Sequence, residues 1–353
     1  MNQLAEEASS LLQNLIRTPS FSGAESETAD LIQEYLEGKD IATNRHLNNV
    51  WTKNMHFDEQ NNTILLNSHH DTVKPSVGYT REPFNPKVED GKLFGLGSND
   101  AGGPLTSLMA TFVHFYEQEN LNYNLVFAAT AEEEISGNNG ISSLLDYLPN
   151  IDCAIVAEPT QMQMATAEKG LMVLDCLAKG KSGHAARDKG ENAIYIAAGD
   201  IEWIQFYQFE KKSDKLGPIK MTPSIINGGS KHNVVPDRCS FTVDVRTTDA
   251  YTNQETLAII QDHLISEVSA RSTRLKPSFI PEKHPIVEAG NKLGLQSFGS
   301  PTLSDQALLS VPSLKLGPGS STRSHTADEF IYLDEIDEGI KTYIQLLELV
   351  IGD

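Results

Sequence analysis

Short apolar runs that end in carboxylate or imidazole groups recur four times along the chain. Each run is continuous, which is typical of a strand buried on both faces of a parallel sheet. The carboxyl ends of such strands face the crevice in which open α/β sheets bind ligands, so we expect the residues that follow to share one edge. The runs and their followers are 63–67 with His69, His70 and Asp71; 125–130 with Glu132, Glu133 and Glu134; 153–157 with Glu158; and 313–316 with Gly317, Gly319, His325, Asp328 and Glu329.

Apolar residues at helical spacing surround these runs. The expected helices cover 4–17, 22–37, 103–118 and 334–350, and another helix follows Pro285. Together with the apolar runs, these helices predict an α/β fold: a catalytic domain whose mostly parallel sheet is flanked by helices.

The pattern changes between residues 170 and 281. Strand-like and helical segments follow one another here in the order β-α-β-β-α-β, the ferredoxin-like arrangement of one sheet backed by two helices. The strands are expected at 171–178, 221–226, 240–245 and 275–280, and the helices at 191–206 and 254–266. We therefore expect an inserted α+β domain at 170–281, which divides the catalytic domain into residues 1–169 and 282–353.

Length, charge and cysteine content narrow the class of protein. The 353 residues suffice for two domains with a sizeable core. The net charge of −20 disfavours nucleic acid and anionic membranes as partners and favours cations. Cys153, Cys176 and Cys239 lie in apolar runs and are expected to be buried free thiols in a reducing compartment. No signal-peptide pattern and no apolar run near the ~20 residues that span a bilayer are present, so we expect a cytoplasmic protein.

Two strand ends carry patterns that suit a bound cation. The adjacent glutamates at 132–134 repel one another, and a cation would offset this repulsion. His69 and Asp71 lie two apart on one side of their strand, where they could act as a metal ligand and its orienting partner. Asp100 precedes the helix at 103–118 and could be a ligand or the residue that caps this helix.

Other motifs are expected to carry no chemistry. Gly95-Leu-Gly97 lacks the third glycine of a dinucleotide-binding loop. His114 is expected to pack within its helix. The histidines expected at the surface are His46, His56, His263 and His284.

Eight motifs in order resemble those of one enzyme family. They are SHHDTV at 68–73, GSND at 97–100, TAEEE at 130–134, AEPT at 157–160, GHAAR at 183–187, NVVP at 233–236, DVR at 244–246 and SHTADE at 324–329. With them the chain resembles, nearly end to end, the co-catalytic metallo-exopeptidase and deacylase family. This family includes acetylornithine deacetylase, succinyl-diaminopimelate desuccinylase, aminoacylase and carboxypeptidase G-type enzymes.

The resemblance implies two zinc ions per subunit, bridged by Asp100 and by a water molecule or hydroxide. One zinc would take His69 and Glu158, and the other Glu134 and His325. Nitrogen and oxygen ligands with open positions suit catalytic zinc, although cobalt or manganese would fit the same set.

The resemblance also implies which residues assist the metals. Glu133 matches the general base, which takes a proton from water and passes it to the departing amine. Asp71 would accept a hydrogen bond from the ring nitrogen of His69 that does not bind zinc, and would thereby fix the tautomer of His69. Glu132 occupies a position that is usually Asp.

In the inserted domain, the resemblance implies a lid that closes over the metals and forms a homodimer. His184 matches a histidine that crosses the dimer interface to stabilise the oxyanion; without the resemblance it would be a surface histidine. Asn233 and Arg246 match residues that bind the substrate carboxylate. Gly317 and Gly319 would place backbone groups near the same substrate.

Two positions depart from the common pattern of the family. Ala101-Gly-Gly-Pro104 follows Asp100 where many relatives have a lysine, so we expect altered charge near the metals but intact metal binding. Arg323 lies in a variable loop and could be a substrate contact or an exposed side chain.

The expected activity is removal of an N-acyl group from an amino acid, first of all from N-acetylornithine in arginine biosynthesis. N-acetylcitrulline, N-succinylornithine, N-acetyllysine, succinyl-diaminopimelate and dipeptides are alternative substrates. A metal-binding protein without turnover would lack a ligand or the base, and none is missing. A metal-dependent phosphoesterase is disfavoured because no basic cluster accompanies the candidate ligands.

Overall fold

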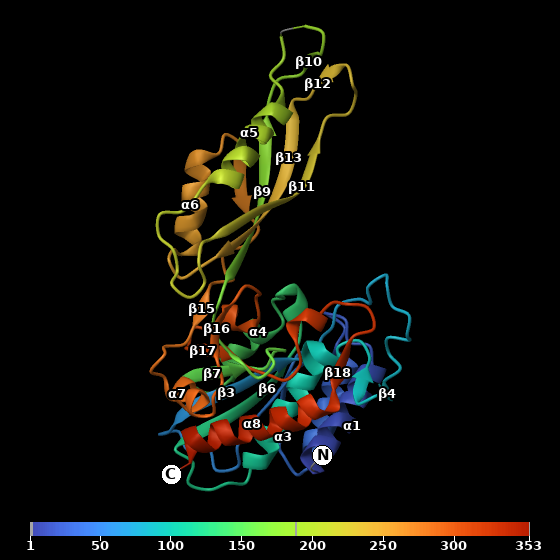
Figure 1. Cartoon of the computed structure of the whole chain (residues 1–353), viewed down its shortest axis with the longest axis vertical. Helices are drawn as coiled ribbons and strands as arrows, with labels where there is room; N and C mark the ends of the chain where they lie inside the picture. The colour runs from blue at the N-terminus through green and yellow to red at the C-terminus, as the bar shows by residue number, and fades with distance from the viewer. Residues whose placement is uncertain (1–2, 188, 353) are drawn as a thin grey trace. The chain divides into compact units, whose positions relative to one another are not determined.

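The computed structural model describes residues 3–187 and 189–352. The chain forms two compact units (Figure 1). The first unit contains residues 1–166, 279–298 and 304–353, and the second contains 167–278 and 299–303.

A nine-stranded sheet in the described part of the chain is the framework of the first unit. Its four central strands, β6-β3-β7-β17, are parallel to one another, and the β1–β2, β2–β6 and β17–β8 pairings are antiparallel. The strands in sheet order are β1 (Asn44–His46), β2 (Asn49–Lys53), β6 (Tyr123–Thr130), β3 (Asn62–His69), β7 (Cys153–Val156), β17 (Ser313–Lys315), β8 (Met164–Glu168) and β15 (Ser278–Phe279), with β16 (Ser297–Ser300) also paired to β8. This arrangement confirms the predicted mostly parallel sheet.

Helices cover both faces of this sheet. Ile64 and Leu66 of β3 pack in the core under helices α3 and α8, whereas Leu65 packs with α4 on the other face. Because both faces of the strand are buried, its apolar run is continuous. The helices of this unit are α1 (Gln3–Arg17), α2 (Ser26–Glu37), α3 (Gly103–Phe115), α4 (Ile141–Leu144), α7 (Pro285–Lys292) and α8 (Leu333–Ile351).

A small three-stranded sheet joins two distant parts of the first unit. Strand β5 (Lys92–Phe94) pairs with β4 (Lys87–Glu89) on one side and with β18 (Phe330–Tyr332) on the other. This pairing brings the segment after His325 to the glycine-rich loop at 95–100.

The second unit has the ferredoxin-like element order. It runs β9 (Gly170–Lys179), α5 (Ala193–Phe206), β11 (Lys220–Gly228), β13 (Arg238–Thr247), α6 (Asn253–His263) and β14 (Glu267–Ala270). The sheet order is β11-β13-β9-β14, with all neighbours antiparallel. Strands β10 (Gly183–His184) and β12 (Val234–Val235) form a separate short pair.

The prediction that residues 275–280 form the fourth strand of this unit is wrong. That strand is β14, whereas Ser278–Phe279 forms β15 of the nine-stranded sheet. Helix α6 ends at His263, which leaves 267–270 free to pair with β9. The error arose because β14 has only Val268 and Ala270 to mark it, whereas 275–280 contains the larger apolar side chains of Leu275, Phe279 and Ile280.

Two further features bear on the sequence predictions. All three cysteines are buried and free. Within residues 3–187 and 189–352, no helix combines the length and the apolar character that crossing a bilayer requires.

Candidate metal centre

The ends of three neighbouring parallel strands bring four of the predicted site residues together. β3 ends at His69, β6 is followed by the turn Glu133–Ile135, and β7 is followed by Glu158. The order β6-β3-β7 places these ends side by side at one edge of the sheet. Buried residues on both faces of the strands fix their register, so the polar ends have defined positions.

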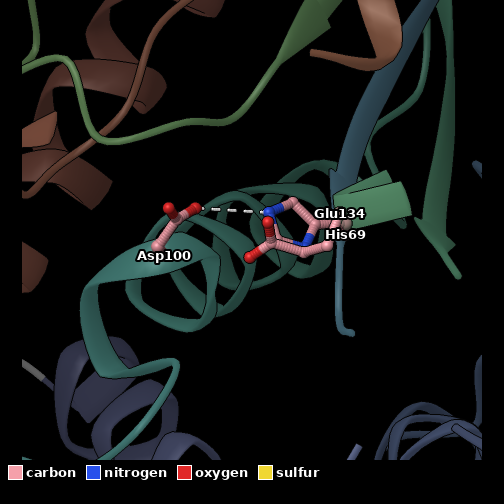
Figure 2. A group of neighbouring side chains, drawn as sticks. All are labelled: His69, Asp100 and Glu134. Atoms are coloured by element: carbon pink, nitrogen blue, oxygen red, sulfur yellow. Dashed lines mark ion pairs between the residues drawn. The ribbon is translucent and has the colours of Figure 1, made fainter. Parts of the chain in front are cut away.

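The side chains of His69, Asp100 and Glu134 form a group that can hold a metal ion (Figure 2). Their ligand atoms all lie within 4.8 Å of one another. The Oδ1 atom of Asp100 lies 3.4 Å from His69 Nε2, and its Oδ2 lies 3.6 Å from His325 Nε2. Each oxygen of Asp100 therefore faces a different histidine, as in a carboxylate that bridges two metal ions.

The other two predicted ligands, Glu158 and Glu134, each lie near one of these two histidines. Glu158 Oε1 lies 3.8 Å from His69 Nε2, and Glu134 Oε2 lies 2.9 Å from His325 Nε2. The structure thus brings all five residues together in the two sets that the resemblance implies. Their role as ligands stays a prediction.

The ring of His69 is oriented by Asp71. His69 Nδ1 lies 3.0 Å from the carbonyl oxygen of Asp71 and 3.4 Å from its Oδ1. Because a carbonyl oxygen only accepts, Nδ1 carries a proton, and Nε2 is left for a second proton or a metal ion. Nε2 is buried and has no hydrogen-bond partner among the described residues. A buried nitrogen of this kind, facing carboxylates, fits a metal ligand.

Asp71 also anchors the turn that carries Glu133 and Glu134. Its Oδ1 accepts the backbone N–H of Glu133 at 3.0 Å, and its Oδ2 accepts that of Glu134 at 3.2 Å and the hydroxyl of Ser22 at 2.6 Å. Burial alone would raise the pKa of Asp71, but the bonds from His69 and Ser22 lower it below its usual value. One ionised side chain therefore orients both the histidine and the glutamate turn.

Negative charge accumulates in the buried site. Burial raises the pKa of Glu158 to about 8, and the neighbouring carboxylates push it the same way. Burial also raises the pKa of Glu133 well above its usual range. These shifts mark negative charge that the nearby side chains leave uncompensated, and divalent cations would compensate it. Together with the unpartnered nitrogen of His69, this shows that the residues present fit two metal ions.

Asp100 does not cap the following helix. Helix α3 begins at Gly103, and its N-cap position is Gly102, without a side-chain cap. The peptide bond between Asp100 and Ala101 is cis. The capping alternative is therefore wrong, and the Asp100 carboxylate faces the histidines.

Arg323 has a structural role. Its Nη2 donates to both carboxylate oxygens of Glu335, at 2.7 and 2.8 Å, and its guanidinium lies 5.0 Å from the centre of the Phe330 ring. Only 13% of the side chain is exposed. The expectation that Arg323 is merely an exposed side chain is therefore wrong, and its guanidinium is already hydrogen-bonded to Glu335.

Gly317 and Gly319 allow a close backbone approach beside the metal group. A Cβ on Gly317 would lie 2.5 Å from the carbonyl oxygen of Glu158, and one on Gly319, at φ +88°, would lie 2.6 Å from Asn99 Oδ1. That oxygen accepts the N–H of Ser320 at 2.9 Å. These contacts explain the glycines structurally, and substrate binding by this loop stays a prediction.

The predicted lid residues lie in the second unit. The N–H of Ala185 donates to the carbonyl oxygen of Asn233 at 3.0 Å, so His184 in β10 lies near Asn233, which directly precedes β12. The guanidinium of Arg246 donates to the Asp244 carboxylate at 2.8 and 3.0 Å. The roles of these residues toward the substrate stay predictions.

His70 is structural despite its place beside His69. It is buried, with Nδ1 2.9 Å from Thr28 Oγ1 and Nε2 2.9 Å from the carbonyl oxygen of Asn48. Burial lowers its pKa to about 4, so the ring is neutral near pH 7.

Two buried carboxylates near the site were not predicted to have a role. Asp305 Oδ2 accepts from Asn67 Nδ2 at 2.9 Å and from Thr130 Oγ1 at 2.7 Å, which ties β3 to β6 just before the site. Burial raises its pKa to about 6. Glu329 accepts three backbone N–H groups of the loop that carries Asp100. No local sequence signal marks Asp305, and the pattern that places Glu329 at the same edge does not reveal its contacts, because the partners of both residues are at least 175 positions away.

Comparison with known proteins identifies the family. The model described as Peptidase family M20/M25/M40 matches residues 65–349. The chain belongs to this family. The match covers every proposed metal ligand, the second unit and most of the first, and it identifies the protein as a metallo-hydrolase. The resemblance expected from the eight motifs is thereby confirmed.

Relatives cover nearly the whole chain at low identity. An acetylornithine deacetylase from Shigella sonnei is 29% identical over 352 residues, covering 90% of this chain and 91% of the relative. A LysW-lysine/LysW-ornithine hydrolase from Sulfurisphaera tokodaii is 25% identical over 349 residues, covering 96% and 94%. The crystal structure of a dinuclear metal-binding M20 peptidase from Bacillus subtilis matches with a TM-score of 0.75 at 16% identity, covering 99% and 98%.

Proposed function

We propose that this metallo-hydrolase uses two zinc ions to remove the N-acyl group from an amino acid. The observation that carries the proposal is the position of Asp100, which stands between His69 with Glu158 and His325 with Glu134. Nitrogen and oxygen donors of this kind suit zinc, and cobalt or manganese would fit the same set.

Glu133 is the proposed general base. Its Oε2 lies 3.9 Å from His69 Nε2, and its backbone N–H is held by Asp71. Two bound metal ions would supply Lewis-acid polarisation of the amide carbonyl and make water more acidic. Glu133 takes a proton from the attacking water. Glu133 then passes this proton to the departing amine.

The first proposed substrate is N-acetylornithine, which would give ornithine and acetate for arginine biosynthesis. Its support is the coverage and identity shared with the Shigella sonnei acetylornithine deacetylase, together with the ornithine in the name of the Sulfurisphaera tokodaii relative. N-acetylcitrulline, N-succinylornithine, N-acetyllysine, succinyl-diaminopimelate and dipeptides are the alternatives that an assay must separate.

We also propose that residues 170–281 form a lid and a homodimer interface. Ile225 and Ile226 on the edge strand β11 are each 54% exposed, and an exposed apolar edge strand suits pairing with a second copy. In this proposal, His184 reaches the oxyanion in the partner's site, and Arg246 with Asn233 binds the substrate carboxylate. The three buried free thiols support a cytoplasmic location.

An amine-release assay on metal-stripped protein tests the proposed function. Zinc or cobalt is added back in steps, and the acyl amino acids named above are compared with simple dipeptides. Metal-dependent release from one acyl amino acid supports the proposal. Release from dipeptides alone would make the protein a peptidase, and no release with two metals bound would contradict the proposal.

A further inference from the structure

Glu329 makes an unusual set of contacts beside the metal group. It is 2% exposed, and its carboxylate accepts three backbone N–H groups: that of Gly97 at Oε2 (3.0 Å) and those of Asn99 and Asp100 at Oε1 (2.8 and 2.9 Å). We propose that Glu329 is a positioning residue that holds Asp100 in the orientation needed to bridge two metal ions. This inference rests on the proposed function.

The backbone places Glu329 under the loop of Asp100. Phe330 pairs with Phe94 in the small sheet, and the carbonyl oxygen of Glu329 accepts the N–H of Gly95 at 3.0 Å. This strand pairing and this hydrogen bond together fix the backbone position from which the Glu329 side chain reaches the loop. The same segment carries His325, so one piece of chain supplies a proposed ligand and supports the bridging one.

The loop needs an acceptor of this kind. Asp100, at φ −120° and ψ 100°, interrupts the helical geometry of 98–102, so the N–H groups of Asn99 and Asp100 lie ahead of the regular helix. Buried N–H groups without a partner are costly. Gly97, at φ +73°, has no room for a side chain, because a Cβ would lie 2.5 Å from Thr72 Cγ2. A single side chain, Glu329, therefore accepts the hydrogen bonds that these N–H groups of the tight loop can donate.

Asp328 offers a matched control one residue away. Its Oδ1 accepts the backbone N–H groups of Thr80 and Arg81, both at 2.9 Å. This is the same kind of bond, made by the adjacent carboxylate to a loop without proposed ligands. Neutralising Asp328 should therefore disturb the fold in a comparable way while leaving Asp100 in place.

The test compares Glu329→Gln with Asp328→Asn by calorimetric titration of the metal-stripped proteins with zinc. The glutamine replaces one acceptor oxygen by an NH2 group, so at least one loop N–H then faces a donor. We expect metal affinity about 10- to 100-fold weaker in Glu329→Gln, the size seen for partners that orient ligands. Affinity in Asp328→Asn should stay within about twofold, as for a substitution remote from the metals.

Hydrogen exchange of the peptide covering 95–101 gives a readout that needs no metal. We expect faster exchange in metal-free Glu329→Gln and wild-type exchange in Asp328→Asn. Wild-type metal affinity in Glu329→Gln, or an equal loss in both variants, would overturn the inference. Should Glu329→Gln fail to fold, Glu329→Asp, which keeps the charge but shortens the reach, must show the same two effects. If wild-type protein binds no metal, the proposed function fails, and exchange alone decides whether Glu329 anchors the loop.

Discussion

The metal group of the first unit and the proposed substrate residues of the second are held in different ways. In the first unit, the buried Asp71 accepts hydrogen bonds from the glutamate turn and from Ser22 and orients the buried ring of His69. In the second, His184 is exposed, and its ring accepts only the nearby N–H of Ala186, at 3.2 Å, among the hydrogen bonds of the described chain. The metal group of the first unit is thus fixed in advance. In the second unit Arg246 is held by Asp244, but the exposed His184 ring has no comparable anchor among the described residues. The proposed reaction class therefore rests on contacts within the first unit, whereas the proposed substrate rests on the relatives.

The largest effect is expected in the first unit, from Glu133→Gln. Loss of the general base should lower kcat by about 10²- to 10⁴-fold. Metal content should stay near that of wild type, because Glu133 is not a proposed ligand. The measurements are kcat in the amine-release assay and metal content by elemental analysis. Near-normal turnover would assign the base to another residue.

The next largest effect is expected in the second unit, from His184→Ala. Loss of an oxyanion donor should lower kcat by about 10²- to 10³-fold without changing metal affinity. If sites are shared across a dimer, mixing this variant with Glu133→Gln creates one intact site per mixed dimer, so part of the activity returns. Mixed dimers that stay inactive would show that each subunit supplies its own histidine, or that His184 has another role.

The smallest effect is expected from Arg323→Gln, which tests whether its bond to Glu335 is only structural. The free energy of unfolding should fall by about 1 kcal/mol, as for a partly exposed ion pair, and kcat/KM should stay unchanged. Denaturant unfolding and steady-state kinetics measure the two quantities. A large rise in KM with normal stability would make Arg323 a substrate contact after all.

The sequence predicted correctly which residues lie together at the sheet edge where these residues follow a local pattern, while their role as ligands stays a prediction. His69, Glu134 and Glu158 stand directly after apolar runs, and parallel strands necessarily bring such ends to one edge of a sheet. Prediction failed where a role depends on distant partners. Nothing in the sequence marks Asp305, and Glu329 was expected at this edge without the loop N–H groups that the fold brings to it.

The second unit shows the same limit at the level of elements. Its order of strands and helices followed from periodicity, but β14 was misplaced because four residues with alternating small and polar side chains carry little hydrophobic signal. The pairing that defines it comes from β9, far earlier in the chain.

The position of β17 in the sheet has a consequence for biosynthesis. This strand lies between β7 and β8, yet it begins at Ser313, and His325 follows it. A nascent chain that has emerged only as far as residue 312 already contains β9 to β14 of the second unit, but its first unit has a gap in the sheet and lacks one proposed ligand. Metal uptake is therefore expected only after residues 313–325 have emerged from the ribosome.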